Sequence, residues 1–90
     1  MSKQYARNGA FQSEDLGDGV LLLNTADNQV IELNRTGARL WRRLEQPATR
    51  DELVQALRDD YPNVTAGSLE ADMDAFLSQA AACKAILELL

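Results

Sequence analysis

The stretch that decides the fold is "NQVIELNRTGARLWRRLEQPATRDELVQAL", residues 28–57. In its first part, residues 29–33, Ile31 and Leu33 fall on one face of a strand and Val30 and Glu32 on the other, so one face can be buried and the other is half apolar. Asn34 or Thr36 can cap a helix directly after this strand. The apolar face of that helix consists of Leu40, Trp41 and Leu44. The stretch therefore predicts a strand that leads straight into a helix.

The second half of the stretch predicts another helix. Thr49 and Glu52 have the spacing of a capping box, in which the hydroxyl accepts a first-turn N–H and the carboxylate accepts the N–H of the capping residue. The helix should begin at about Arg50 and stop at Tyr61-Pro62. Its buried stripe consists of Leu53, Val54 and Leu57.

Two more strand-like segments precede the stretch, at residues 9–15 and 20–24. Turn residues separate them, and connections this short can join only antiparallel neighbours. We therefore expect a three-stranded meander with residues 29–33 as its third strand and one of its edges. In that strand Ile31 and Leu33 fall on the core face. The middle strand is apolar on both faces, so other elements are expected to cover both.

A third helix is expected after the turn "PNVTAG", with Ser68 as its cap. Its apolar residues recur at helical spacing, and they are Leu69, Met73, Phe76, Leu77 and Ala80. The final segment "KAILELL" is expected to pack as the last turn or a short extension. The predicted fold class is α+β, winged-helix-turn-helix-like: a three-stranded antiparallel β-meander followed by three α-helices.

The composition predicts one globular domain, residues 1–90, with residues 1–8 flexible. Hydrophobic residues make up 46% and charged residues 26% of the 90-residue chain, as in ordinary globular domains. No apolar run reaches the roughly 18 residues that a membrane span needs, and the start lacks the apolar core of a signal peptide. The expected location is the cytoplasm, without a membrane partner.

The residue inventory excludes most catalytic chemistry. Histidine is absent and Cys83 is the single cysteine, so intrachain disulfides, Cys/His zinc sites and histidine-based catalysis are excluded. We expect no enzyme activity, no catalytic residue, no metal and no cofactor. Cys83 is expected to behave as a small apolar residue, and Trp41 to lie in the core.

Charge is distributed unevenly along the chain, whose net charge is −5. Basic residues concentrate between residues 35 and 50, whereas the predicted third helix carries Glu70, Asp72 and Asp74. A winged-helix DNA-binding regulator would place that helix in the major groove, where its carboxylates would be repelled by phosphate. We expect no nucleic-acid partner, although the arginine cluster keeps a DNA-binding regulator as the alternative function.

The order of motifs resembles the PqqD family, which is named for the pyrroloquinoline quinone biosynthesis D protein. The resemblance rests on "ELNRTGARLWRRL", on the spacing T-x-x-E-L-V-x-A-L-x-x-x-Y, and on "DMDAFL", and it covers residues 20–87. Members are also called RiPP recognition elements, RiPPs being ribosomally synthesised and post-translationally modified peptides. Gln46-Pro47 and Ala85 stand where the family commonly has glycine, and both positions concern helix ends.

The resemblance implies a non-catalytic peptide binder. In that family the leader segment of a precursor peptide adds as an antiparallel strand to the third strand and lies in the cleft beside the third helix. The partners it implies are this leader and a RiPP-modifying enzyme or leader peptidase that receives the precursor. The candidate peptide-binding residues are Gln29, Val30, Ile31, Glu32, Leu33, Asp72, Met73, Phe76 and Gln79.

The residues of the third strand independently favour strand addition. The segment "QVIEL" has neither Pro nor Lys, so nothing in it blocks pairing at a free sheet edge. The same edge would also allow pairing with a second copy, so the chain is expected to be a monomer or an edge-strand dimer. A scaffold subunit that only stabilises a larger enzyme is a further possibility.

Several charged and apolar residues have two possible roles, one structural and one in binding a partner. The acidic face of the third helix is either a solvated face or selects a leader with Lys or Arg. Phe76 and Leu77 are expected mainly in the core, with only a cleft-facing fraction available to a peptide. The last group is the arginine cluster of the first predicted helix, Arg39, Arg42 and Arg43. These arginines are either surface charges, some of them paired with Glu45 or Asp51, or a docking patch for an acidic enzyme.

Overall fold

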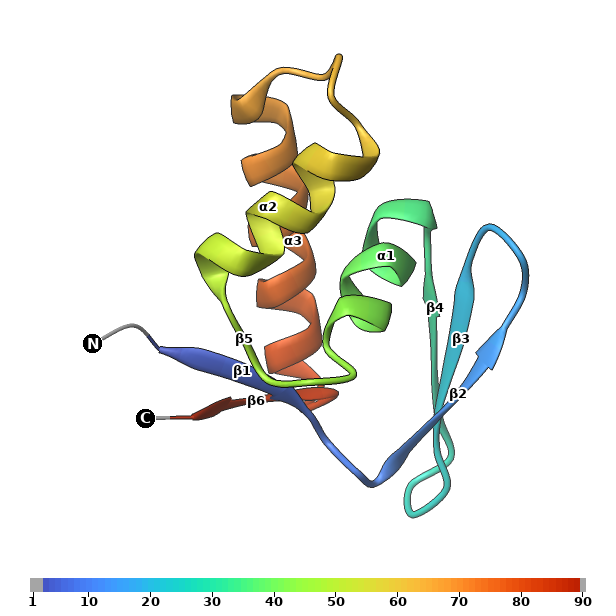
Figure 1. Ribbon diagram of the computed structural model, residues 1–90. Coiled ribbons are helices and arrows are strands. Elements are labelled where there is room, and N and C mark those ends of the chain that lie inside the picture. Colours follow the sequence, from blue (N-terminus) through green and yellow to red (C-terminus); the bar gives the residue numbers. More distant parts are fainter. Residues whose placement is uncertain (1–2, 90) are drawn as a thin grey trace.

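The computed structural model describes residues 3–89 and contains the predicted meander. Strands β2 (Phe11–Asp15), β3 (Val20–Asn24) and β4 (Gln29–Leu33) form an antiparallel sheet in the order β2-β3-β4 (Figure 1). Val20 pairs with Leu33 and Asn24 pairs with Gln29. The sheet therefore ends at β4, as the sequence predicted.

Helices cover only one face of this meander (Figure 1). Val20 and Leu22 of β3 are buried, whereas Leu23 on the opposite face is 37% exposed. The expectation that other elements cover both faces of the middle strand is therefore wrong, because no described element packs on the outer face. On β4 the same alternation buries Leu33 and leaves Val30 57% exposed.

The helices begin where local capping chemistry places them. Helix α1 (Arg35–Arg43) is capped by Asn34, whose Oδ1 accepts the Gly37 N–H at 2.8 Å, and not by Thr36. Helix α2 (Arg50–Asp60) has the predicted capping box. Its two hydrogen bonds run from Thr49 N–H to Glu52 Oε1 (2.8 Å) and from Glu52 N–H to Thr49 Oγ1 (3.2 Å).

Helix α3 (Ala66–Ala82) begins earlier than the sequence predicted. Thr65 is its cap and accepts the Ser68 N–H at 3.4 Å, so Ser68 lies inside the first turn and the expectation that it is the cap is wrong. Both residues carry a hydroxyl that suits a cap, and the structure selects the upstream one. The predicted stripe is confirmed, since all its members are buried: Leu69, Met73, Phe76, Leu77 and Ala80.

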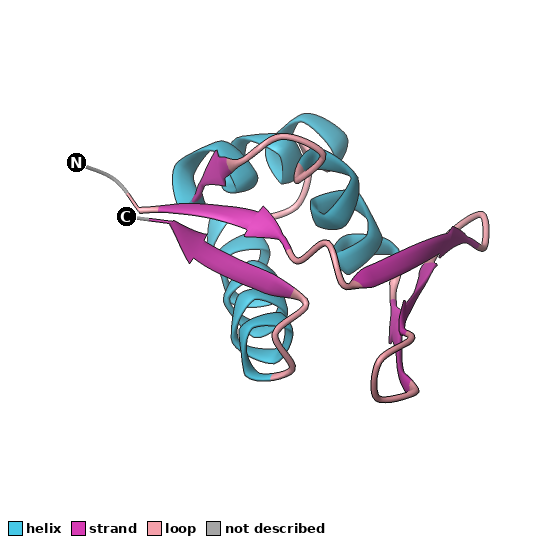
Figure 2. Ribbon diagram, turned by 90° about the horizontal axis from the view of Figure 1, so that it is seen from below, coloured by secondary structure: helices cyan, strands magenta, loops and turns pink. Residues whose placement is uncertain are grey.

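A second sheet, which the sequence did not predict, joins the two ends of the described chain. Strands β1 (Gln4–Arg7), β5 (Ala48–Thr49) and β6 (Ile86–Leu89) pair in the order β5-β1-β6. Figure 2 shows β1 and β6 side by side. Lys84, with φ 65°, lets the chain reverse after α3, so the final segment becomes a strand instead of the expected helical extension.

The expected flexible start at residues 1–8 also differs from the structure. Residues 4–7 form β1 because β6 supplies a complete antiparallel partner, in which Gln4 pairs with Leu89 and Arg7 pairs with Ile86. Asn8 adds a hydrogen bond from its N–H to the Ala85 carbonyl at 2.9 Å. Residues 1–2 lie outside the described part of the chain.

Trp41 lies in the core, as predicted, at 2% exposure. The Arg7 guanidinium stacks on its ring at 4.6 Å and donates to the Trp41 carbonyl from Nε at 3.0 Å. Burial lowers the pKa of Arg7, and the Glu45 carboxylate partly opposes that shift. As the single tryptophan, Trp41 reports on packing of the core by its fluorescence.

None of the described helices is long and apolar enough to cross a bilayer.

Gly19, directly before β3, lies close to the backbone at the end of β4. An ideal Cβ at this position would lie 2.7 Å from the Leu33 carbonyl oxygen, which is backbone and cannot turn away. Gly19→Ala is therefore expected to lower the free energy of unfolding by about 1–3 kcal/mol, measured by urea unfolding followed by Trp41 fluorescence. Gly9→Ala is the control, since nothing lies within 4 Å of a Cβ there; equal losses in both variants would contradict the argument.

Glu52 should make the stability depend on pH. The Thr49 backbone N–H holds the pKa of this carboxyl below its ordinary value of 4.5, so the folded state favours the ionised form. Its stabilisation is complete above the unfolded-state pKa and is lost as the pH falls through the folded-state pKa. We expect Glu52→Gln to unfold at lower urea than the wild type at pH 7, and the difference to shrink as the pH falls below 4.5. Glu14→Gln, an exposed carboxylate on β2, serves as the control and should show a much smaller change.

Candidate functional site

The edge of β4 carries backbone groups that β3 does not use. The close approach of Gly19 to the Leu33 oxygen shows that the Leu33 carbonyl points toward β3. Backbone groups of successive residues in an antiparallel strand point to opposite sides. The N–H and C=O groups of Val30 and Glu32 therefore point away from β3, toward the open edge. Such groups can form a ladder with an added strand.

A groove runs beside this edge, between β4 and α3. Its wide end is a hollow of about 240 Å³ at the start of α1, and its narrow end is a hollow of about 10 Å³. Leu33, Phe76 and Gln79 line both hollows, which are thus parts of one feature, named here the β4–α3 groove. Further residues of the wide end include Glu32, Thr36, Gly37 and Asp72, and those of the narrow end include Ile31, Ala80, Cys83 and Ala85.

The floor of the groove depends on close packing around Gly37. An added Cβ there would lie 3.4 Å from both the Leu33 Cβ and the Phe76 Cδ1. The start of α1 therefore packs directly against β4 and α3. This contact fixes the distance between the strand and the helix that border the groove.

The predicted site residues are brought together with one exception. Gln29 to Leu33 form β4, and Asp72, Phe76 and Gln79 line the groove. Phe76 is only 6% exposed, so it offers little more than one edge of its ring. Met73 is fully buried in the core and does not reach this surface.

Sequence reasoning missed eight lining residues, among them Thr36, Gly37, Ala80 and Cys83. Ala80 and Cys83 continue the helical spacing of Phe76 and Gln79 on the same face of α3, and that spacing could have identified them. Thr36 and Gly37 belong to the first turn of α1, which reaches the groove only through tertiary packing. No local signal in the sequence indicates their position.

The three carboxylates on the acidic face of α3 do not share the same neighbours. Arg50 of α2 binds Asp74 with Nη2 to Oδ1 at 3.0 Å and lies 4.0 Å from Glu70. Asp72 instead lines the groove. Of these three carboxylates, Asp72 alone faces the space beside the β4 edge.

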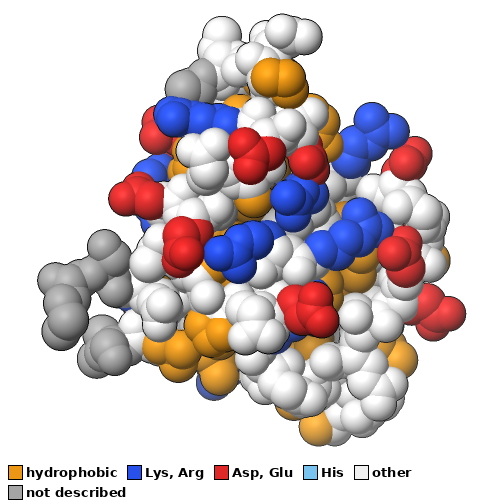
Figure 3. Space-filling view, viewed as in Figure 1, with side chains coloured by type: hydrophobic (Ala, Val, Ile, Leu, Met, Phe, Trp, Pro, Cys, Tyr) orange, Lys and Arg blue, Asp and Glu red, His pale blue; other side chains and the backbone are white. Residues whose placement is uncertain are grey.

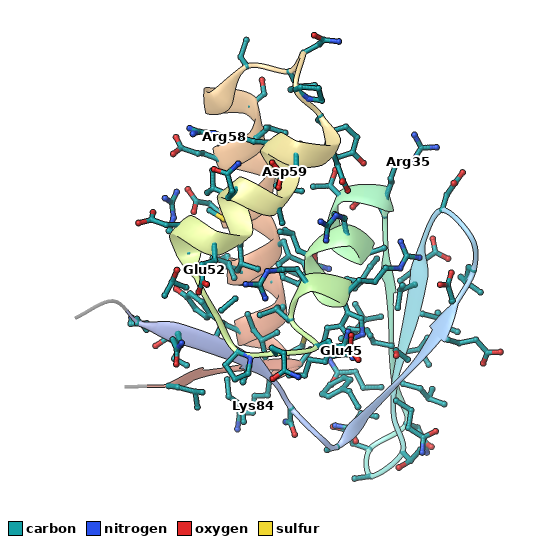
Figure 4. The ribbon with its side chains drawn as sticks, viewed as in Figure 1. Arg35, Glu45, Glu52, Arg58, Asp59 and Lys84 are labelled. Atoms are coloured by element: carbon teal, nitrogen blue, oxygen red, sulfur yellow. The ribbon has the colours of Figure 1, made fainter. Side chains whose placement is uncertain are left out.

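The arginines of α1 are surface charges whose positive charge is balanced locally. Their partners are not the predicted Glu45 and Asp51, because Glu45 lies past the end of α1 (Figure 4) and the carboxylates within reach come from other elements. Lys, Arg and acidic side chains interleave over the face made by α1 and α2 (Figure 3). The pairs are Arg39 with Asp60, Arg42 with Asp15, and Arg43 with Glu52.

Within residues 3–89, no group of three or more Cys, Asp or Glu side chains is arranged to hold a metal ion. What the groove presents is a free strand edge, an apolar floor and one carboxylate. These are features of a small binding domain that takes an extended ligand.

The family comparison agrees with this class of protein. The sequence matches the family model described as "Coenzyme PQQ synthesis protein D (PqqD)" over residues 19–86, and the chain belongs to the PqqD family. Proteins of this family, the RiPP recognition elements, are non-catalytic binding proteins of peptide natural product biosynthesis.

A solved structure shares the fold. It is described as "TbiB1 in Complex with the TbiA(beta) Leader Peptide" and superposes with a TM-score of 0.79 at 27% sequence identity. The match covers 90% of this chain and 93% of the other. A search of curated proteins found no match. The relative with this fold was therefore solved together with a leader peptide.

Proposed function

We propose that this protein binds the leader segment of a ribosomally synthesised precursor peptide by antiparallel strand addition to β4, and presents the precursor to a modifying enzyme or leader peptidase. The observation that carries the proposal is the open β4 edge beside the β4–α3 groove. The leader peptide bound to the relative with this fold supports it.

Strand addition explains why the edge and the groove lie together. The outward N–H and C=O groups of Val30 and Glu32 would pair with the peptide backbone, which supplies affinity without reading sequence. Every second peptide side chain would then face α3, where Phe76, Gln79 and Cys83 line the groove. An affinity of about micromolar, or roughly −8 kcal/mol, is expected because ordering a flexible peptide opposes these contacts.

The geometry favours peptide over DNA as the ligand. A major-groove helix needs cations facing phosphate, and α3 presents Glu70, Asp72 and Asp74. The four arginines of α1 each form an ion pair with a carboxylate, Arg35 with Asp18 and the other three as described above, so the charge of that surface is largely balanced. We therefore propose no nucleic-acid partner for this surface.

Val30→Pro tests the edge directly. Proline removes the outward N–H of Val30 but spares the β3–β4 ladder, which uses the neighbouring residues, so the fold should survive. Leader affinity is expected to fall by at least about tenfold, since one hydrogen bond is lost and the incoming strand is displaced. The measurement is fluorescence anisotropy with a labelled synthetic leader from a short precursor gene beside the gene of this protein, with circular dichroism as the fold check.

Val30→Thr is the matched control, because threonine keeps both the backbone N–H and the β-branched shape. Its affinity should stay close to that of the wild type. Labelled duplex DNA at two salt concentrations should give flat titrations with all three proteins. If Val30→Pro bound the leader as the wild type does, the β4 edge would not be the docking site.

A further inference from the structure

The two ends of the β4–α3 groove differ in chemistry. The wide end has the carboxylate-bearing Asp72 among its lining residues, whereas the narrow end is lined by Ile31, Ala80 and Cys83. Neither hollow has a Lys or Arg among its lining residues. An extended ligand would therefore meet negative charge at one end and an apolar surface at the other.

Asp72 is the carboxylate best placed to form an ion pair with a cationic side chain of a ligand. Its neighbours on α3, Glu70 and Asp74, are both engaged by Arg50, whereas Asp72 has no ion pair with any residue between 3 and 89. Glu32 alternates with Leu33 along β4, so its side chain leaves the sheet on the face opposite α3. Asp72 is exposed on α3 and lines the wide end of the groove.

The direction of an added strand follows from the lining residues. Glu32 of β4 lines only the wide end, together with Asp72, and Ile31 lines only the narrow end, together with Cys83, so β4 and α3 run in opposite directions (Figure 1). A peptide antiparallel to β4 therefore runs in the direction of α3. Its N-terminal part lies beside Asp72 and its C-terminal part beside Cys83.

The spacing of the two chemistries along the peptide also follows. Asp72 and Ala80 are about 12 Å apart along the axis of α3, at about 1.5 Å per residue. Side chains on one face of a strand recur about every 6.7 Å. Two such steps, or about four peptide residues, therefore carry the peptide from Asp72 to Ala80 and the narrow end.

We propose that the groove selects leader segments in which a Lys or Arg precedes an apolar residue by about four positions, and that Asp72 is the specificity-determining residue for the cation. This inference rests on the proposed strand addition at β4 and adds the chemical class of peptide that the site takes. The narrow hollow is too small to enclose a side chain, so the apolar residue covers Ile31, Ala80 and Cys83 from above.

The test uses a display library of random peptides selected on the immobilised full-length protein, so it does not require the natural leader. The wild type should enrich peptides with a basic residue about four positions before an apolar one. Asp72→Lys should reverse the preference and enrich Glu or Asp at that position. Asp74→Asn, on the same helix but facing Arg50, is the control and should keep the wild-type motif.

One enriched peptide then gives a double-mutant cycle by anisotropy. Replacing its basic residue with Gln should weaken binding to the wild type by about threefold to tenfold, the range for an ion pair with partial solvent exposure. The same replacement should have almost no effect on binding to Asp72→Asn. Circular dichroism of each variant checks the fold.

Two results would overturn the inference in distinguishable ways. Peptides enriched without a basic preference, or an unchanged motif with Asp72→Lys, would remove the role of Asp72 and leave strand addition standing. A library that enriches equally on Val30→Pro, or that enriches nothing on the wild type, would overturn strand addition together with the inference.

Discussion

The contact on which the groove depends is the meeting of Leu33, Gly37 and Phe76. A Cβ at Gly37 would lie 3.4 Å from both the Leu33 Cβ and the Phe76 Cδ1, so the start of the first helix packs closely against both the strand and the third helix. Because the strand passes into α1 without a loop, Asn34 caps the helix at the groove itself. The sequence "LNRTG" therefore sets both the end of the strand and the distance to α3.

Ion pairs between elements determine which charges face the groove. Arg42 of α1 forms an ion pair with β2, Arg43 of α1 forms one with α2, and Arg50 of α2 forms one with α3. Each pair is solvent-exposed and contributes little stability alone. Together, however, they hold the cations of the helical face beside carboxylates of neighbouring elements, and no Lys or Arg is among the residues that line the groove with Asp72.

Local signals in the sequence predicted the parts of the fold that depend on neighbouring residues. The alternation of Ile31 and Leu33 placed β4, and the Thr49–Glu52 pair placed the start of α2, because strand faces and capping boxes are decided within a few residues. At α3 two hydroxyl residues competed for the cap, and position alone could not separate Thr65 from Ser68.

The parts that sequence reasoning missed depend on distant partners. Strand β1 pairs with β5 and β6, and nearly the whole chain separates it from β6. The carboxylate partners of the arginines likewise come from other elements. At the candidate site, the strand and the face of α3 could be predicted, whereas Thr36 and Gly37 reach the groove only once α1 is packed.

The pairing of β1 with β6 has a consequence for how the chain can be connected. Gln4 lies opposite Leu89, so the two ends of the described chain are neighbours across a hydrogen-bonded ladder. A short linker could join them without disturbing the packing, and new ends could be opened at the exposed turn between α2 and α3. The arrangement of elements is thus compatible with circular permutation, which would leave the β4 edge and its neighbours unchanged.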